Sequence, residues 1–417
     1  MNLHRLLCIS ASCVFLAGCA TGPAPDDDPT VAGEEQPLTS FAPTYDVVVS
    51  AAADERTVGP PVIATDGSAY VMLFNRGNGT GRVQAVAPDG ALRASSPAFP
   101  VDSNVGFGLG LDDDGNVYAQ ELTCRRVGSP ISSGLCSGAL LSFTPSLVQR
   151  WRSTLFVDRP VWSWYLGLES PRFDTITKNI YARIGSVAAV TKAGAVRWQV
   201  DAVSANAFDI DANGDVLVAG SQGSSCWLER HAADGAVKWT NRSSLDPVPC
   251  VRSLRIVPDG NVMLSADGRL SEMSATGAIT PLARTPSATC FQCTVRTPFT
   301  LMRGDRAAAL WSASGTQFTL VASRRDGSAA WERPKVGEFG VAAYGGGVLA
   351  QAVEAGTLCA LGAAGNVRAC FTPNAGSRRW GVGVAVSGNE VFALLAVASG
   401  NSPFSSETRL SRLKALR

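Results

Sequence analysis

Two kinds of β-hairpin alternate along this chain of 417 residues. In the first kind, alternating apolar residues flank a turn made of Asp, Asn or Gly, as in FDIDANGDVLVAG at 208–220. These turn residues tolerate the positive φ angles of a type I′ turn, so each copy predicts two antiparallel strands. The copies lie at 62–73, 109–120, 173–184, 208–220 and 254–265, with weaker ones at 301–312, 341–352 and 384–395.

The second kind follows the first and consists of a strand, a turn ending in Gly and a strand that is apolar or carries Trp. Its copies lie at 86–95, 143–152, 190–200, 230–240, 273–282, 323–333 and 361–371. Two successive hairpins form a four-stranded antiparallel unit that repeats about every 40–45 residues, the size of one propeller blade. The composition agrees, because 46% apolar and only 17% charged residues suit many short buried strands. We therefore predict an all-β fold, a single β-propeller of eight four-stranded blades, with seven as the alternative number.

The two ends of the chain are expected to share one blade. The hairpin at 384–395 is followed by TRLSRLKAL at 408–416, which leaves the last blade one strand short. The segment TYDVVVSA at 44–51 precedes the first complete repeat and has no hairpin of its own. We expect it to pair beside 408–416 and to close the ring, since an open ring would expose unpaired sheet edges.

The N-terminal residues have the features of an export signal. An apolar run at 6–16 follows a short basic start and is too short to span a bilayer core of about 30 Å as a helix. The sequence LAGC at 16–19 resembles the bacterial lipobox, which implies cleavage before Cys19 and lipid attachment to it; an ordinary secretory signal is the alternative. Ala20, where an aspartate would retain the protein at the inner membrane, implies sorting to the outer membrane.

The residues that follow Cys19 have the composition of a tether. Pro, Asp, Glu, Gly and small residues at 20–40 show no apolar periodicity and cannot bury a core. We predict a lipoprotein signal peptide at 1–18, a lipidated flexible tether at 19–43 and the propeller at 44–417.

The lipobox, the tether and repeats that end in GAVRW or GAVKW resemble the pyrroloquinoline-quinone-type propeller repeat, and within it the propeller lipoproteins of the outer-membrane barrel-assembly machinery. This resemblance implies a propeller over about residues 44–416. It also implies an outer-membrane lipoprotein in the envelope of a Gram-negative bacterium, facing the periplasm or the exterior.

The cysteines beyond the signal and Cys19 form an even set. In an oxidising compartment, pairing of sequence neighbours into disulfides is the default expectation. The candidates are Cys124, Cys136, Cys226, Cys250, Cys290, Cys293, Cys359 and Cys370. For the C-x-x-C at 290–293, a structural disulfide, a redox role and metal binding with a second pair are the interpretations, whereas c-type haem attachment is excluded because Thr294 follows in place of histidine.

Two acidic turns are candidate calcium sites. Asp209, Asp211 and Asn213 have the spacing of the first half of a calcium loop, but the twelfth position holds Gly220 in place of a bidentate acid. The same kind of turn recurs in other repeats, so a blade turn is the favoured interpretation. The second candidate is the acidic turn with Asp112 and Asp114. We expect no other cofactor.

Aromatic and basic residues mark two candidate binding surfaces. Trp162, Trp164 and Tyr165 could form a platform for a sugar or a peptide, with packing between blades as the alternative. The second candidate is a rim with residue types enriched at protein interfaces, and its alternative is a solvated loop. It consists of Arg378, Arg379 and Trp380.

Charge and histidine content restrict the function. A net charge of +1 without a long Lys/Arg run gives no support for nucleic-acid binding. His231 is the only histidine beyond the signal, so a histidine-based metal site or a Ser-His-acid triad would depend on it alone. We expect a monomeric, lipid-anchored, non-catalytic binding or scaffold module for a protein, a peptide or a glycan. The alternative is an envelope enzyme, either a polysaccharide-active enzyme or a quinone-linked dehydrogenase. Three or more charged side chains that converge near the propeller axis would favour this alternative.

Overall fold

The computed structural model divides the chain into two units, Met1–Gln36 and Pro37–Arg417, and the residues that it describes all belong to the second. The described residues are 38, 40–52, 54–57, 59–101, 108–126, 134–161, 169–200, 205–222, 225–241, 251–257, 260–266, 269–274, 279–283, 294–295, 300–302, 306–314, 317–324, 329–344, 347–352, 357–373, 378–398 and 407–416. The predicted signal peptide, Cys19 and most of the predicted tether therefore lie outside them.

Every regular element in these ranges is a β-strand, which confirms the all-β prediction. The first sheet holds β2 (Glu55–Thr57), β3 (Val62–Ile63), β4 (Ala69–Asn75), β5 (Thr80–Val86), β6 (Leu92–Ser95) and β7 (Phe99–Pro100). Four sheets of four strands follow along the chain: β8 (Leu109–Leu111), β9 (Val117–Arg126), β10 (Gly134–Phe143) and β11 (Gln149–Val161); β12 (Glu169–Phe173), β13 (Asn179–Ile184), β14 (Ser186–Thr191) and β15 (Val196–Gln199); β16 (Ala205–Ile210), β17 (Val216–Gln222), β18 (Ser225–His231) and β19 (Val237–Asn241); β20 (Val251–Ile256), β21 (Val262–Ala266), β22 (Arg269–Met273) and β23 (Ile279–Ala283).

The remaining strands form one sheet of eight and one of four. The larger holds β24 (Thr294–Val295), β25 (Thr300–Met302), β26 (Arg306–Ser314), β27 (Gln317–Arg324), β28 (Ala329–Tyr344), β29 (Gly347–Ala352), β30 (Leu358–Leu361) and β31 (Val367–Phe371). The smaller holds β32 (Arg378–Ser387), β33 (Glu390–Ala398), β34 (Glu407–Leu416) and β1 (Ser40–Ser50). Among the described residues, no helix has the length and hydropathy that crossing a membrane requires.

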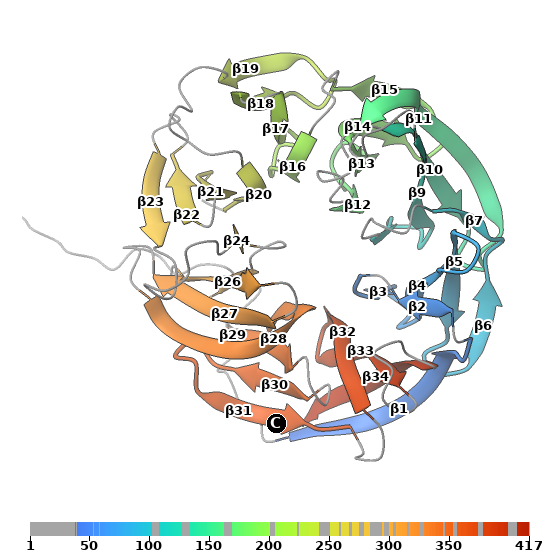
Figure 1. Cartoon of the computed structure of the whole chain (residues 1–417), viewed down its shortest axis with the longest axis vertical. Coiled ribbons are helices and arrows are strands. Elements are labelled where there is room, and N and C mark those ends of the chain that lie inside the picture. The colour runs from blue at the N-terminus through green and yellow to red at the C-terminus, as the bar shows by residue number, and fades with distance from the viewer. Residues whose placement is uncertain are drawn as a thin grey trace, which may run out of the picture. The chain divides into compact units, whose positions relative to one another are not determined.

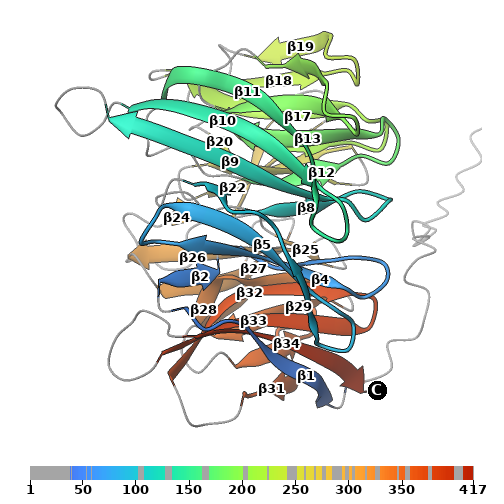
Figure 2. The ribbon, with the colours of Figure 1, turned by 90° about the vertical axis from the view of Figure 1, so that its right-hand side faces the viewer.

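Within residues 37–417 the sheets follow one another around a centre, as in a β-propeller (Figure 1). The first strands β12, β16 and β20 lie toward the middle, and the last strands β6, β11, β15, β19 and β31 lie along the rim (Figure 1). Seen from the side, successive sheets lie face against face (Figure 2). Their facing side chains form the core, whose largest cluster is built from strands between β4 and β14.

The long strand β28 joins two groups of strands into the eight-stranded sheet. Its first half pairs with β27 up to Val336, which also lies opposite Ala352 of β29. After a register shift, its second half pairs with β29 from Val341 onward. Division of β28 at this shift would turn the sheet into two units. The first would hold β26, β27 and half of β28, with the short strands β24 and β25 both paired to β26, and the second would hold four strands. The described sheets would then correspond to eight such units, and the number of blades stays a prediction.

The hairpins lie where the sequence predicts them, but their turns differ from the predicted type. In the first, Ala64 and Ser68 close a loop in which Gly67 N–H donates to the Ala64 carbonyl. Only the glycine of this loop has a positive φ, of 82°, whereas a type I′ turn needs two such residues. The loop is therefore a type I turn followed by a left-handed glycine, and the type I′ prediction is wrong here.

The first and last described strands pair with each other. β1 runs antiparallel to β34, with Ser40 opposite Leu416 and Val47 opposite Leu410. The pairing joins 44–51 to 408–416 as the sequence predicts. Strand β1 begins at Ser40, so the last residues of the predicted tether are part of the sheet.

A contact that recurs in three repeats explains the GAVRW pattern. Trp151 and Trp198 each donate an indole N–H to a backbone carbonyl in the following sheet. Trp331, on the first half of β28, donates to a carbonyl between β30 and β31 of the same sheet. These carbonyls belong to Lys192, Ala233 and Ala363, and we call each one a junction carbonyl. Each indole lies against the glycine two residues further on, where an added Cβ would approach the ring to 2.8, 2.5 and 2.4 Å. Only glycine leaves room for the indole at these positions.

At two other places where neighbouring sheets meet, which we also call junctions, a carbonyl at the same position of the turn is bonded by a side chain other than tryptophan. Tyr70 O–H donates to the Pro145 carbonyl at 3.0 Å, and Arg412 donates to the Pro88 carbonyl. At the Pro88 junction, the ring of Tyr45 from β1 packs on Gly90 as the indoles do on their glycines. At the Pro145 junction, the glycine is replaced by the buried Leu147, with φ 63°, and the tryptophan by Ala94. The large residue is therefore in the turn and the small residue on the strand, the reverse of the Trp–Gly junctions.

Candidate functional site

Three consecutive inner strands carry a charged residue at the same position, one residue before the strand end. These residues are Arg172 on β12, Asp209 on β16 and Arg255 on β20. Because the strands are equivalent in successive repeats, the three side chains lie at one level around the centre of the propeller. With Glu169 and Arg183 they form what we call the inner-strand charge cluster.

Asp209 links three sheets within this cluster. It accepts a hydrogen bond from Arg172 in the preceding sheet and from the backbone N–H of Ile256 in the following one, the latter at 2.7 Å. The guanidinium of Arg255 lies 3.7 Å from the same carboxylate. Arg172 also lies over the ring of Phe208, 4.9 Å from its centroid, which orients the guanidinium.

Glu169 has a similar role one sheet earlier. Its Oε2 lies 3.8 Å from Arg183 Nε and 4.0 Å from Arg172 Nη2, and it faces the backbone N–H of Phe208 at 3.4 Å. Arg183 donates to the Ala205 carbonyl at 3.0 Å, and its side chain is only 4% exposed. Its Nε has no hydrogen-bond partner among the described groups.

The described side chains of the cluster carry three positive and two negative charges. Burial lowers the pKa of Arg183, a shift that Glu169 opposes and Arg172 adds to. Burial also lowers the pKa of Arg255, and repulsion from Arg172 adds to this effect. Both guanidiniums remain charged at neutral pH because the ordinary arginine pKa is so high. The cluster therefore holds a desolvated excess of one positive charge.

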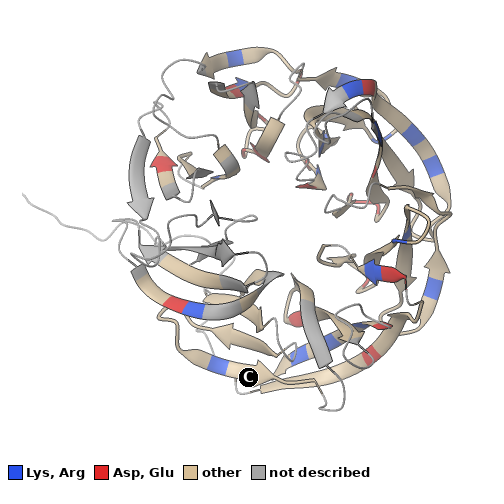
Figure 3. Ribbon diagram, in the orientation of Figure 1, with Lys and Arg blue, Asp and Glu red and all other residues tan. Residues whose placement is uncertain are grey.

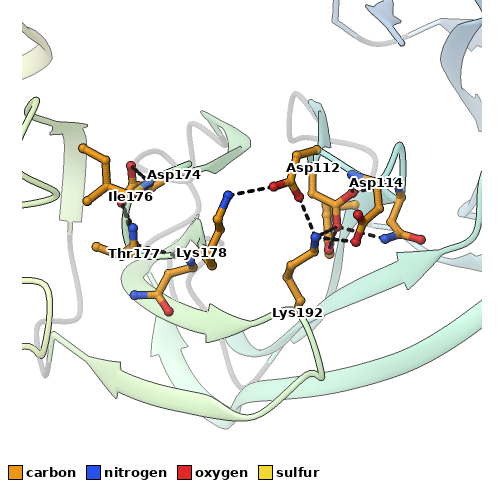
Figure 4. Close-up of polar contacts among 11 residues, drawn as sticks. Asp112, Asp114, Asp174, Ile176, Thr177, Lys178 and Lys192 are labelled. Atoms are coloured by element: carbon orange, nitrogen blue, oxygen red, sulfur yellow. Dashed lines mark hydrogen bonds and ion pairs between the residues drawn. The ribbon is translucent and has the colours of Figure 1, made fainter. Parts of the chain in front are cut away.

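The second charged group contains the predicted acidic turn. Asp112, Asp113 and Asp114 could together hold a metal ion on distance alone. Instead, Lys192 from the next sheet reaches all three carboxylates, at 2.5 Å from Asp113, and Lys178 lies 2.8 Å from Asp113 (Figure 4). An ammonium group occupies the place that a bound cation would take.

This pairing has the expected electrostatic signature. Hydrogen bonds from Lys178 and Lys192 lower the pKa of Asp113 to about 2. Burial would lower the pKa of Lys192, but the bonds to Asp113 and Asp114 and the charge of Asp112 outweigh it and raise that pKa. Asp112 also accepts hydrogen bonds from Asn116 and Tyr118, so its carboxylate is engaged within its own sheet.

The predicted calcium half-loop is built differently from a calcium site. Asp209 belongs to the inner-strand charge cluster. Asp211 accepts the backbone N–H groups of Asn213 and Asp215 and pairs with Arg230. These carboxylate oxygens stabilise the turn and bind a guanidinium.

Two of the predicted disulfides are present. Cys124 pairs with Cys136 across β9 and β10, and Cys359 pairs with Cys370 across β30 and β31. Cys226 is also disulfide-bonded. Its predicted partner Cys250, and the C-x-x-C cysteines Cys290 and Cys293, lie outside the described residues.

The predicted binding surfaces are only partly described. Trp162, Trp164 and Tyr165 lie outside the described residues. Arg378, Arg379 and Trp380 open strand β32, so their backbone is in a sheet and not in the solvated loop that was the alternative. His231 is buried and stacks on Trp198, with 5.4 Å between ring centroids. Lysine, arginine and acidic residues are otherwise spread over the sheets (Figure 3).

Sequence reasoning missed the inner-strand charge cluster. A signal was present, because Arg172, Asp209 and Arg255 each occur two residues before a turn begins in three successive repeats. Aligning the repeats and asking which charged residues fall at one position would have found them. Arg183 and Glu169 have no such regularity.

Of the comparisons with known proteins, the one with solved structures bears on the fold. No known family model and no curated protein sequence matches the chain. Among solved structures, BamB from Moraxella catarrhalis is similar, with a TM-score of 0.53 and 15% identity over 90% of this chain and 98% of that one. Virginiamycin B lyase from Staphylococcus aureus has a TM-score of 0.47 and 9% identity over 90% and 100%. The likeness to BamB shows a β-propeller, and the weaker likeness to the lyase carries no argument.

Proposed function

We propose that this protein is a lipid-anchored propeller of the cell envelope that acts as a non-catalytic binding or scaffold module for a protein, a peptide or a glycan. The lipobox-like LAGC sequence at 16–19 supports the anchor, and the cysteine pairs support an oxidising compartment. The BamB-like fold is consistent with an outer-membrane lipoprotein that works within a complex.

The observation that carries the scaffold proposal is the series of bonded junction carbonyls. Four of them tie one sheet to its neighbour through a buried or partly buried donor, and the bond of Trp331 joins the two groups of strands within the eight-stranded sheet. Sheets joined in this way keep their loops in a constant relative position. Such a surface suits a binding module, because little conformational entropy is lost when a partner binds.

The inner-strand charge cluster brings together enough charged groups to raise the enzyme alternative. Its two carboxylates, however, are both paired with guanidiniums and both face a backbone N–H of the next sheet. A general acid or base needs an oxygen that can exchange a proton with a substrate. The arrangement is therefore better suited to holding sheets together and to binding an anion than to proton transfer.

The proposal can be tested in the native envelope. Metabolic labelling with palmitate should mark the wild-type chain and fail to mark the Cys19→Ala variant, which should also leave the membrane fraction. Crosslinking in cells should recover a specific partner with the wild type. A label that survives Cys19→Ala would contradict the anchor. Turnover of an envelope polysaccharide or an alcohol by the purified chain would contradict the non-catalytic proposal.

A further inference from the structure

We infer that the inner-strand charge cluster is a binding site for a small oxyanion, with Arg172 and Arg255 as the groups that contact it. The first argument is charge. Three guanidiniums share two carboxylates in a partly desolvated position. An excess charge removed from water is costly unless a counter-charge reaches it.

The second argument is an unsatisfied donor. Arg183 is almost fully buried, its nearest carboxylate oxygen lies 3.8 Å from Nε, and that Nε makes no hydrogen bond to any described group. Buried polar atoms are nearly always hydrogen-bonded. Glu169 is therefore shared between Arg183 and Arg172 and fully satisfies neither.

The third argument is access. The side chains of Arg172 and Arg255 are 24% and 22% exposed, so neither side chain is fully closed off from solvent. They flank Asp209 from the sheets on either side, and Arg255 lies beyond hydrogen-bond distance of that carboxylate, at 3.7 Å. The planar guanidinium presents several N–H donors that match the oxygens of a phosphate or a carboxylate.

This site is independent of the lipid anchor and of any protein partner. Arg172 and Arg255 bind the anion from adjacent sheets, and Arg183 contributes positive potential from behind Glu169. The bound group neutralises the excess charge and links the sheets of β12 and β20 through Asp209. The observations specify an oxyanion, and the probes below separate phosphate from carboxylate.

The test is thermal unfolding and calorimetric titration of the full chain with sodium phosphate, sodium acetate or sodium chloride at one ionic strength. We expect phosphate or acetate to raise the melting temperature in a saturable manner that chloride does not reproduce. Arg255→Gln should weaken binding about tenfold or more, as loss of one charge-assisted hydrogen bond predicts. Arg93→Gln removes the same charge from β6 and should bind like the wild type.

A second variant acts in the opposite direction. Glu169→Gln keeps the shape of the side chain and an acceptor oxygen but raises the net charge of the cluster, so it should bind the anion more tightly than the wild type. Equal responses to all three salts would overturn the inference. So would equal affinities of the wild type, Arg255→Gln and Glu169→Gln.

Discussion

At the scale of single residues, the buried Tyr70 and the partly buried Tyr45 have different roles at equivalent junctions. Tyr70 donates its hydroxyl to a junction carbonyl, whereas the hydroxyl of Tyr45 has no hydrogen-bond partner among the described residues. Burial raises the pKa of both phenols, that of Tyr45 to about 12. The ring of Tyr45 packs on Gly90, so its contribution is contact area.

We predict opposite outcomes for the same substitution at these two sites. Tyr70→Phe should lower the free energy of unfolding by about 1–3 kcal/mol, because the Pro145 carbonyl loses its partner. Tyr45→Phe should be neutral or slightly stabilising, because it removes a buried hydroxyl that makes no bond. Urea unfolding of both variants measures the difference. Equal losses of stability would show that the hydroxyl of Tyr70 has no special role.

The acidic turn makes a second prediction at this scale. Because the ammonium of Lys192 lies within 4 Å of the carboxylates of Asp112, Asp113 and Asp114, where a cation would bind, millimolar calcium should leave the melting temperature of the wild type unchanged. Lys192→Gln removes the ammonium and leaves three carboxylates within reach of one ion, so calcium should stabilise this variant. Differential scanning fluorimetry measures the melting temperatures of both chains with calcium and, as the control, with sodium chloride. A wild type that responds as strongly as the variant would mean that calcium binds beside the lysine.

At the scale of elements, the repeat that predicts the strands also determines how the sheets meet. Strand positions follow from alternating apolar residues and turn residues, which are local properties of the chain. The contact of Trp198 with Gly235 joins two repeats, so it becomes visible only when their spatial order is known. For the same reason, the type I′ prediction failed: the sequence shows an Asp-Gly pair but not the loop length around Gly67.

The exchanged pair Ala94 and Leu147 allows a test of the junction. Ala94→Trp alone should destabilise by about 1–3 kcal/mol through overpacking against the core that contains Leu147. Leu147→Gly alone should cost about 2–5 kcal/mol by opening a cavity. The double variant restores the pattern of the other junctions, and its cost should be smaller than the sum by at least about 1 kcal/mol. Additive losses in chemical denaturation would show that the two positions are not coupled.

At the scale of the whole molecule, pairing of β1 with β34 brings the start of the described chain beside its end. The sequence predicts this pairing, because the last hairpin lacks one strand and the first segment lacks a partner. For the inner-strand charge cluster, aligned repeats can show that three charged residues share one strand position, but not that their side chains meet. Its members come from three repeats, and their contacts depend on how neighbouring sheets rotate against each other.

Moving the first strand to the other end of the chain should preserve the fold. Ser40 lies opposite Leu416, so a permuted chain that starts at Ala51 and continues from Arg417 through a short Asn-Gly linker into Leu38–Ser50 would form an ordinary hairpin. We expect far-ultraviolet circular dichroism and a melting temperature close to those of the parent chain. Deletion of Leu38–Ser50 is the control, and it should give aggregation because β34 then has an open edge. A soluble deletion variant with unchanged stability would contradict the role of β1.

The partnership of β1 and β34 also orders events in time. The residues that the ribosome makes early complete their sheet with residues that it makes last. Until translation has reached the C-terminal strand, Ser40–Ser50 has no native partner, whereas each hairpin in between can form as soon as it has been made. A chain released before Glu407 would lack β34, so β1 would have no strand to pair with. Formation of the last sheet therefore depends on synthesis of the final residues.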